Sequence, residues 1–239
     1  MIVEAVQLSD LDGDFEFYYD EKYTYRGQCS HSLSTKDILL HQNQEVRIWA
    51  RHKYSTPVNY IPFINWLGVT RTKHKFVVYD ELIPIATITH QLKSFKQRFK
   101  IELTNSDIFY VYAYQENDFY YLSVYKNIYK QEQQIALIER MVGVNCKYKL
   151  YLPDEFSDLS NVLSIFMLYF QNHLTSFKPY FIITPRGFSV ETRPDYTFYR
   201  YRSFCNSKAA QTYDPTWRER NFPSENFFGP INIDKDTKI

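Results

Sequence analysis

The stretch that most restricts the folds open to this chain is SDLSNVLSIFMLYFQNH, from Ser157 to His173. Ser157 and Asp158 are residues that commonly cap helix N-termini, so a helix is expected here. From Val162 to Phe170 only Ser164 is not bulky and apolar, which leaves this helix without a polar face. A bilayer-spanning helix needs roughly 20 apolar residues, more than the segment holds. We therefore predict a helix that is buried inside the protein.

Most of the chain before this helix has the pattern of β-strands. Tyr (22) and Phe (19) are frequent and Gly (6) is scarce, a composition that favours half-buried strands. Turn residues separate the predicted strands, which are 2–8, 15–19, 23–28, 38–40, 45–52, 75–79, 83–90, 98–104, 108–114, 119–125, 134–140 and 147–152. The predicted fold class is mainly β, a closed antiparallel barrel of about twelve strands around one buried hydrophobic helix at 157–172.

The chain is long enough for one large β domain, and we assign residues 1–204 to a single barrel domain. After the helix, 180–184 and 188–192 are expected to form a hairpin, and 196–204 a further strand. Residues 205–239 form a proline-interrupted, irregular tail that either packs on the barrel or extends from it.

The charge balance argues against a partner bound by bulk electrostatics. Lys plus Arg number 28 against 27 Asp plus Glu, so the net charge is only +1 and nucleic acid is not expected. Cys29, Cys146 and Cys205 are widely spaced without a CxxC motif, which is typical of reduced thiols in a cytoplasmic protein. No transmembrane segment is predicted, and peripheral association with a membrane and the oligomeric state remain open.

The residues from Lys75 to Asn172 resemble the tubby C-terminal-like superfamily, which includes tubby proteins, phospholipid scramblases and LURP-one-related proteins; the resemblance is to a bacterial-type member. The resemblance rests on KFVVYDE, IPIATITHQ, RFKIEL, IFYVYAY, FYYLSVY, QIALIERM, KYKLYLPDE and LSNVLSIFMLYF, in this order. It implies a closed barrel threaded by its hydrophobic helix and a non-enzymatic role in binding a ligand or a membrane surface. In that family the helix lies near the C-terminus, whereas here some 65 residues follow it. No match to the phosphoinositide-binding residues of tubby proteins can be assigned.

No enzyme signature occurs, since GxSxG, P-loop, GxGxxG and HExxH motifs are absent from the sequence. The six histidines are spread along the chain without metal-ligand spacing. We therefore predict no catalytic residues, no metal site and no cofactor.

Two rows of cations are the best candidates for a ligand-binding site. The first row is Lys96, Arg98 and Lys100, and the second is Arg71, Lys73 and Lys75. In a strand, each row would share one face and could meet an anionic lipid headgroup or an acidic protein surface. The apolar segment Pro57–Val69 beside the second row is either a buried connection or an exposed loop that would suit a membrane surface. The rows could equally be the solvated outer face that any barrel needs.

The C-terminal tail suggests an alternative function as a protein-interaction module. Its isolated aromatic residues are Trp217, Phe222, Phe227 and Phe228. Binding energy at protein interfaces concentrates in aromatic anchors, so these residues are candidates for binding a partner.

Overall fold

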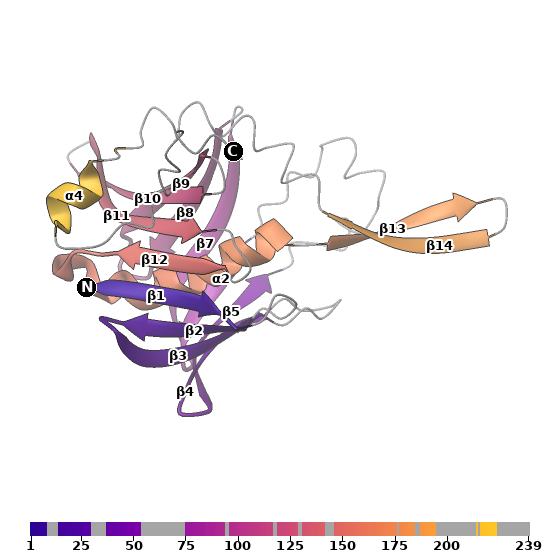
Figure 1. The fold of residues 1–239 in the computed structure, drawn as a ribbon, viewed down its shortest axis with the longest axis horizontal. Coiled ribbons are helices and arrows are strands. Elements are labelled where there is room, and N and C mark those ends of the chain that lie inside the picture. Colours follow the sequence, from indigo (N-terminus) through magenta and orange to yellow (C-terminus); the bar gives the residue numbers. More distant parts are fainter. Residues whose placement is uncertain are drawn as a thin grey trace, which may run out of the picture.

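The computed structural model describes residues 1–8, 14–29, 37–53, 75–93, 96–116, 119–128, 131–141, 146–175, 177–184, 187–194, 214 and 216–223. A meander of strands precedes a central helix (Figure 1). The strands of the meander are β1 (Ile2–Gln7), β2 (Asp14–Tyr19), β3 (Lys22–Cys29), β4 (Asp37–Gln42), β5 (Glu45–Lys53), β6 (Lys75–Asp80), β7 (Ile83–Lys93), β8 (Lys96–Leu103), β9 (Ile108–Glu116), β10 (Phe119–Ile128), β11 (Gln131–Met141) and β12 (Lys147–Tyr151).

These strands form a closed antiparallel barrel in which each strand pairs with its neighbours in the sequence. The barrel closes where β1 pairs with β12, with Ile2 opposite Tyr151 and Val6 opposite Lys147. Closure leaves no unpaired edge in the wall. The predicted barrel around a buried helix is confirmed.

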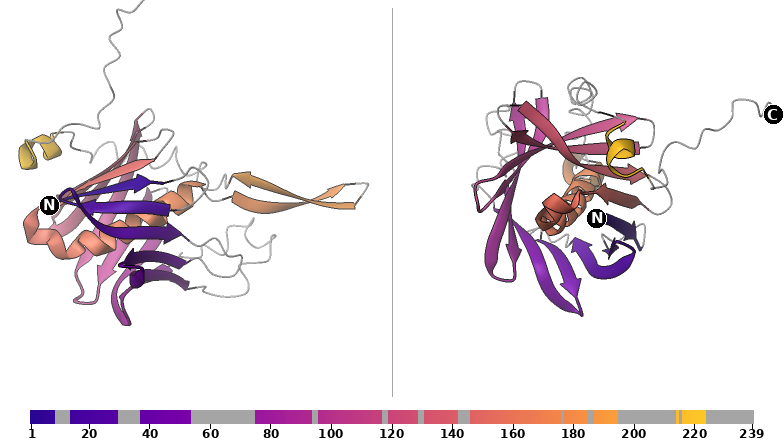
Figure 2. Two further views of the ribbon diagram at one scale, coloured as in Figure 1. Left: turned by 60° about the horizontal axis from the view of Figure 1, so that its bottom comes forward. Right: turned by 90° about the vertical axis from the view of Figure 1, so that its left-hand side faces the viewer.

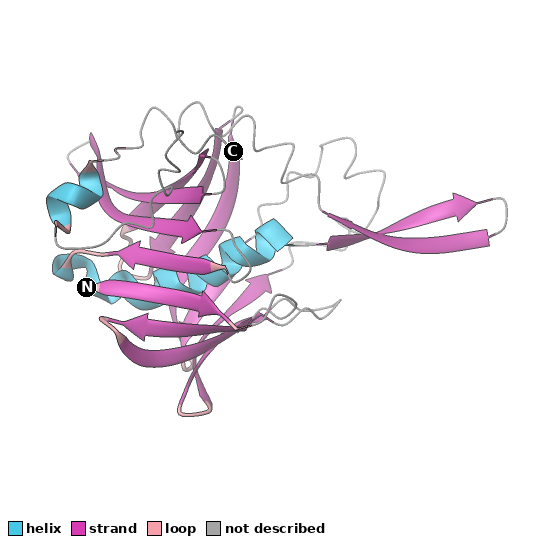
Figure 3. Cartoon of the chain, in the orientation of Figure 1, coloured by secondary structure: helices cyan, strands magenta, loops and turns pink. Residues whose placement is uncertain are grey.

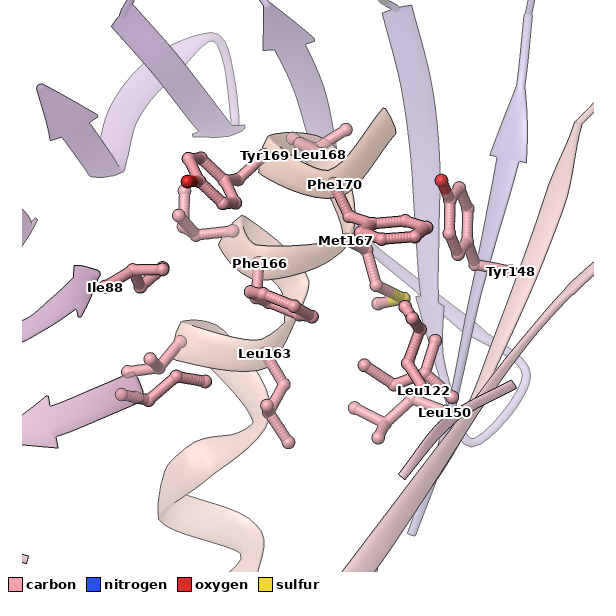
Figure 4. Packing of buried hydrophobic residues seen from close by; sticks show 14 of the residues in the cluster. Ile88, Leu122, Tyr148, Leu150, Leu163, Phe166, Met167, Leu168, Tyr169 and Phe170 are labelled. Atoms are coloured by element: carbon pink, nitrogen blue, oxygen red, sulfur yellow. The ribbon is translucent and has the colours of Figure 1, made fainter. Parts of the chain in front are cut away.

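The helix α2 (Ser160–Thr175) lies inside this barrel, as the end-on view in Figure 2 shows. It begins later than predicted, because a 3₁₀ helix, η2 (Asp154–Leu159), occupies the preceding turns and has a non-helical Phe156 at φ −113°. Leu163, Phe166 and Phe170 are at most 1 % exposed. Figure 4 shows the helix side chains directed toward opposite parts of the wall. The barrel interior is therefore a packed core.

The two ends of the barrel are built differently. At the turn end, defined by the turns at 20–21, 43–44, 81–82 and 104–107, short hairpins join the strands and several residues have positive φ. At the helix-exit end, β5, β7 and β11 finish, β6, β8 and β12 begin, and Gln171 near the end of α2 contacts Cys146. Everything that follows α2 in the chain therefore starts from the helix-exit end.

A separate two-stranded sheet, called here the ribbon, follows α2 and consists of β13 (Phe177–Thr184) and β14 (Gly187–Pro194). It extends away from the barrel in Figure 1 and in the left view of Figure 2. The predicted hairpin is therefore present, but as a sheet of its own. The predicted strand 196–204 lies outside the described residues.

The described residues of the tail include a short helix, α4 (Trp217–Asn221). Figure 3 shows α2 inside the barrel and α4 outside it. Within the described residues, no helix combines the length and the apolar character needed to cross a membrane.

Candidate functional site

The structure places Lys75, from the second basic row, on the same outer surface of the barrel as Arg98 and Lys100 of the first row. Arg98 and Lys100 of β8 lie on the outer face, because Phe99 and Ile101 between and beyond them are buried inside. On β7, Thr89 is opposite both Lys75 of β6 and Lys100 of β8. We call Lys75, Arg98 and Lys100 the basic face. Arg71 and Lys73 lie outside the described residues, as does Pro57–Val69.

The cations of the basic face differ in how strongly they are held. Lys100 Nζ lies 2.8 Å from a carboxylate oxygen of Glu102, and this hydrogen bond lowers the pKa of Glu102. Arg98 donates from Nε to Gln91 at 3.0 Å, and its guanidinium lies 4.0 Å from the ring centre of Tyr110. Lys75 is exposed. The three cations of the basic face outnumber its acidic neighbour Glu102, which forms an ion pair with Lys100.

More lysines stand at the strand ends beside this face. Lys53 of β5 is opposite Lys75, and Lys93 of β7 is opposite Lys96 of β8. Adjacent strands lie about 4.8 Å apart, so like charges in these pairs repel unless something compensates them. The backbone register therefore concentrates lysine positions at the helix-exit end of β5–β8.

The tail aromatics, predicted as partner anchors, are partly occupied within the chain itself. Trp217 is 7 % exposed, donates from Nε1 to the Gln134 carbonyl at 3.1 Å, and belongs to an apolar cluster with Leu137 and Tyr151. The ring of Phe222 lies 5.5 Å from that of Tyr151. Phe227 and Phe228 lie outside the described residues. In this conformation α4 is a strap on the outside of the barrel.

A buried ion pair that the sequence analysis missed fixes the strap to the wall. Arg218 Nη1 lies 3.2 Å from Glu139 Oε1, and both residues are 2 % exposed. The Tyr151 hydroxyl donates to the same carboxylate at 3.2 Å. Burial raises the pKa of Glu139, and the charge of Arg218 opposes that rise. The run IALIER could have indicated burial on both faces of this strand, because a strand with one exposed face shows alternating apolar and polar residues.

The next residue along β11, Arg140, faces the barrel interior instead. Its Nε donates to the Tyr148 hydroxyl at 2.9 Å and to Gln171 Oε1 at 3.0 Å, and Tyr148 donates to Gln171 at 2.8 Å. Among the described residues, no carboxylate forms an ion pair with Arg140. This polar cluster ties the last turns of α2 to the wall at the helix-exit end.

One groove of about 450 Å³ lies at the opposite, turn end of the barrel. It separates η2 and β11 from α4, and its lining includes Glu132, Glu155, Asp214 and Trp217. Arg220 also lines it and forms an ion pair with Asp214. The groove is therefore acidic, and it shares no residue with the basic face.

The described residues hold no cluster of three or more His, Cys, Asp or Glu that could bind a metal ion. Cys146 lies beside Arg140, yet burial raises the pKa of its thiol and favours the protonated, unreactive form. The prediction that the chain is not an enzyme stays a prediction.

Three comparisons with known proteins were made, against family models, curated proteins and solved structures. None of these comparisons found a match to this chain. The tubby-like resemblance therefore stays a prediction from the sequence pattern.

Proposed function

We propose that the chain is a non-enzymatic binding protein that recognises an anionic lipid surface through its basic face. The barrel interior cannot receive a ligand, because α2 fills it with side chains such as Phe166 that are fully buried. Binding is therefore assigned to the outside of the wall. The tubby-like resemblance agrees with this kind of function.

The observation that carries the proposal is the register of β5–β8. It sets Lys75 and Lys100 on either side of Thr89 and places Lys53 and Lys96 at the same end of the barrel. An anionic bilayer attracts such clusters, with a contribution of about 1 kcal/mol for each Lys or Arg near its surface. Arg98 is held by Gln91 and Tyr110, and an arginine guanidinium is well suited to bind phosphate oxygens.

The test is co-sedimentation with vesicles of phosphatidylcholine, with and without phosphatidylserine. Reversing two charges of the face, Lys75→Glu with Arg98→Glu, should lower binding to the anionic vesicles by about tenfold or more. The matched control is Lys22→Glu with Arg26→Glu, which makes the same charge change on β3, where Lys22 is exposed and Arg26 is held by Asp14. Equal loss in both variants would show a non-specific charge effect and reject the basic face.

A second candidate function, binding of a partner protein, is favoured by an apolar patch at the turn end. Leu82 is 87 % and Ile83 68 % exposed, and Val46 is exposed nearby. Trp49 stacks on Tyr79 with ring centres 4.1 Å apart, and Arg51 lies over Trp49. Trp, Tyr and Arg are the residues most enriched in interface hot spots. Leu82→Ser with Ile83→Ser should then abolish partner capture, while vesicle binding is retained.

A further inference from the structure

The ribbon of β13 and β14 has one polar and one apolar face. In its antiparallel register Phe181 is opposite Val190 and Ile183 is opposite Phe188, while Ile182 is opposite Ser189. Residues two apart in a strand share a face, and so do directly paired residues. The apolar face holds Phe177, Pro179, Phe181, Ile183, Phe188, Val190, Thr192 and Pro194, among which only Thr192 is polar.

The opposite face carries the charges of the ribbon. It holds Lys178 opposite Arg193, and Tyr180 opposite Glu191. Lys178 and Arg193 stand at the base of the ribbon, where β13 follows α2, and the Ile183–Phe188 pair stands near the far tip. The ribbon is therefore cationic at its base and apolar along the face that leads to its tip.

A two-stranded sheet of this kind is marginally stable in water by itself, and a third strand or a packing surface normally supports it. The ribbon pairs with no other described strand and extends away from the barrel (Figures 1 and 2). Eight residues at about 3.3 Å each give a length of about 26 Å. Because no described strand supports the ribbon, an apolar face of this length is expected to pack against a partner.

The positive charge near the base of the ribbon indicates which kind of partner the apolar face binds. The ribbon leaves the barrel at the helix-exit end, where β5–β8 place Lys53, Lys75, Lys93 and Lys96. An anionic bilayer compensates this charge and accepts an apolar face between its headgroups. A second copy of the chain would add the same cations to the same place.

We infer that the ribbon is a membrane-docking element, whose apolar face enters the interface of an anionic bilayer. The cationic base lies at the headgroups, and the basic face of the barrel meets the same surface. This inference rests on the proposed function and adds to it the element that enters the lipid.

The test is cysteine scanning along β13 with an environment-sensitive fluorophore, in the full-length chain carrying Cys205→Ser. Phe181→Cys and Ile183→Cys should give blue-shifted emission on addition of phosphatidylserine-containing vesicles, whereas Tyr180→Cys and Ile182→Cys should not. Of the remaining thiols, Cys146 is buried and Cys29 is partly buried, and burial raises the pKa of both, which favours the protonated form that labels slowly. No shift at any position, or equal shifts at all four, would overturn the inference.

A pair of matched variants supplies a second measurement. Phe181→Glu with Ile183→Glu should reduce vesicle binding by about tenfold, a change of about 1.4 kcal/mol in binding free energy. The control, Tyr180→Glu with Ile182→Glu, adds the same charge to the same strand on the other face. Both variants should keep the melting temperature of the barrel, because the ribbon is a separate sheet. Similar binding of the two variants counts against the inference.

The results separate this inference from the proposed function. If the basic-face variant loses binding and the ribbon variants do not, the basic face stands and the ribbon assignment is wrong. If the alternating shifts persist after Lys75→Glu with Arg98→Glu, the ribbon assignment stands and the basic face is rejected. A doubled mass without vesicles, abolished by Phe181→Glu with Ile183→Glu, would identify the occupant as a second copy and overturn the lipid assignment.

Discussion

The barrel wall consists of two regions that bury their strands differently. Every second residue is buried throughout β1 and over the first four residues of β2 and β4, and the residues between them are partly exposed. In β11 and β12, by contrast, consecutive residues from Ile135 to Arg140 and from Tyr148 to Tyr151 are buried on both faces. The first region has solvent outside, whereas α4 packs against the second. Burial of the outward-facing residues of a barrel strand therefore indicates that a second layer covers the strand.

The comparison is sharpest at Glu139 and Arg140, neighbours on β11 with opposite orientations. Glu139 lies outside the wall and is compensated by Arg218 of the strap, while Arg140 lies inside among neutral groups. A buried charge whose partner is removed is costly, whereas neutral neighbours can satisfy one another. Four substitutions test how the covered and the solvent-exposed regions of the wall differ, in order of expected loss of stability.

The largest effect is expected for Arg218→Ala, which removes the ion-pair partner of the buried Glu139 carboxylate. The cost should be about 3–5 kcal/mol of unfolding free energy near neutral pH. Because the folded-state pKa of Glu139 is already raised, loss of Arg218 raises it further. At acidic pH Glu139 is protonated and no longer carries a buried charge. The destabilisation by Arg218→Ala should therefore become smaller as the pH falls from about 7 to about 5.

Urea denaturation at both pH values measures this cost. The control is Arg220→Ala, since Arg220 is 63 % exposed in its ion pair with Asp214 and should cost below about 1 kcal/mol. A small, pH-independent cost for Arg218→Ala would mean that the strap does not bury Glu139 in solution.

Arg140→Ala should cost less, about 2 kcal/mol, because the Tyr148 hydroxyl still donates to Gln171 after the change. Its cost should not vary between about pH 5 and pH 7, since burial raises the pKa values of Tyr148 and Cys146. The same denaturation experiment checks this. A pH dependence as large as that of Arg218→Ala would remove the contrast between the two faces of β11.

Gly27→Ala tests the packing of β3 against α2, in the region of the wall whose outer face is exposed to solvent. A Cβ atom at Gly27 would lie 2.6 Å from Phe17 Cε2 and 2.8 Å from Leu168 Cδ1. Overpacking of this kind should cost about 1–2 kcal/mol, measured as a lower melting temperature. Full stability in this variant would show that α2 is loosely seated against β3.

The smallest effect is expected for Arg26→Ala, the residue before Gly27 on the outer face of β3. Arg26 is half exposed and pairs with Asp14 at 2.7 Å. Exposed ion pairs contribute about 0–1 kcal/mol, so thermal unfolding should change little. A cost equal to that of Gly27→Ala would contradict a solvated outer face in this region.

The sequence predicted the parts of the fold that one-dimensional patterns describe. An apolar run without a polar face, Val162–Phe170, predicted a buried helix, and short strands predicted the barrel, because both periodicities follow from local geometry. The helical segment begins at Asp154 with the 3₁₀ helix η2, and the α-helix itself begins at Ser160, three residues after the expected cap Ser157.

Features that depend on which residues meet in space could not be predicted in the same way. The pairing of Glu139 with Arg218 joins residues 79 apart, and no local pattern encodes such a distance. The position of Lys75 relative to Lys100 requires the register of β6, β7 and β8. The sequence placed these two cations in separate rows, and the register of the strands determines that Lys75 and Lys100 share one face.

Closure between β1 and β12 also constrains how the protein comes to fold. Strand β1 pairs with β12, which lies about 145 residues later in the chain, and contacts of such long sequence separation form slowly. The helix that occupies the lumen is synthesised after the complete wall, so a nascent chain carries a dozen strands whose inward faces lack their central packing partner. Productive folding is therefore expected only after residue 175 has left the ribosome, which makes the unfinished chain a natural client of chaperones.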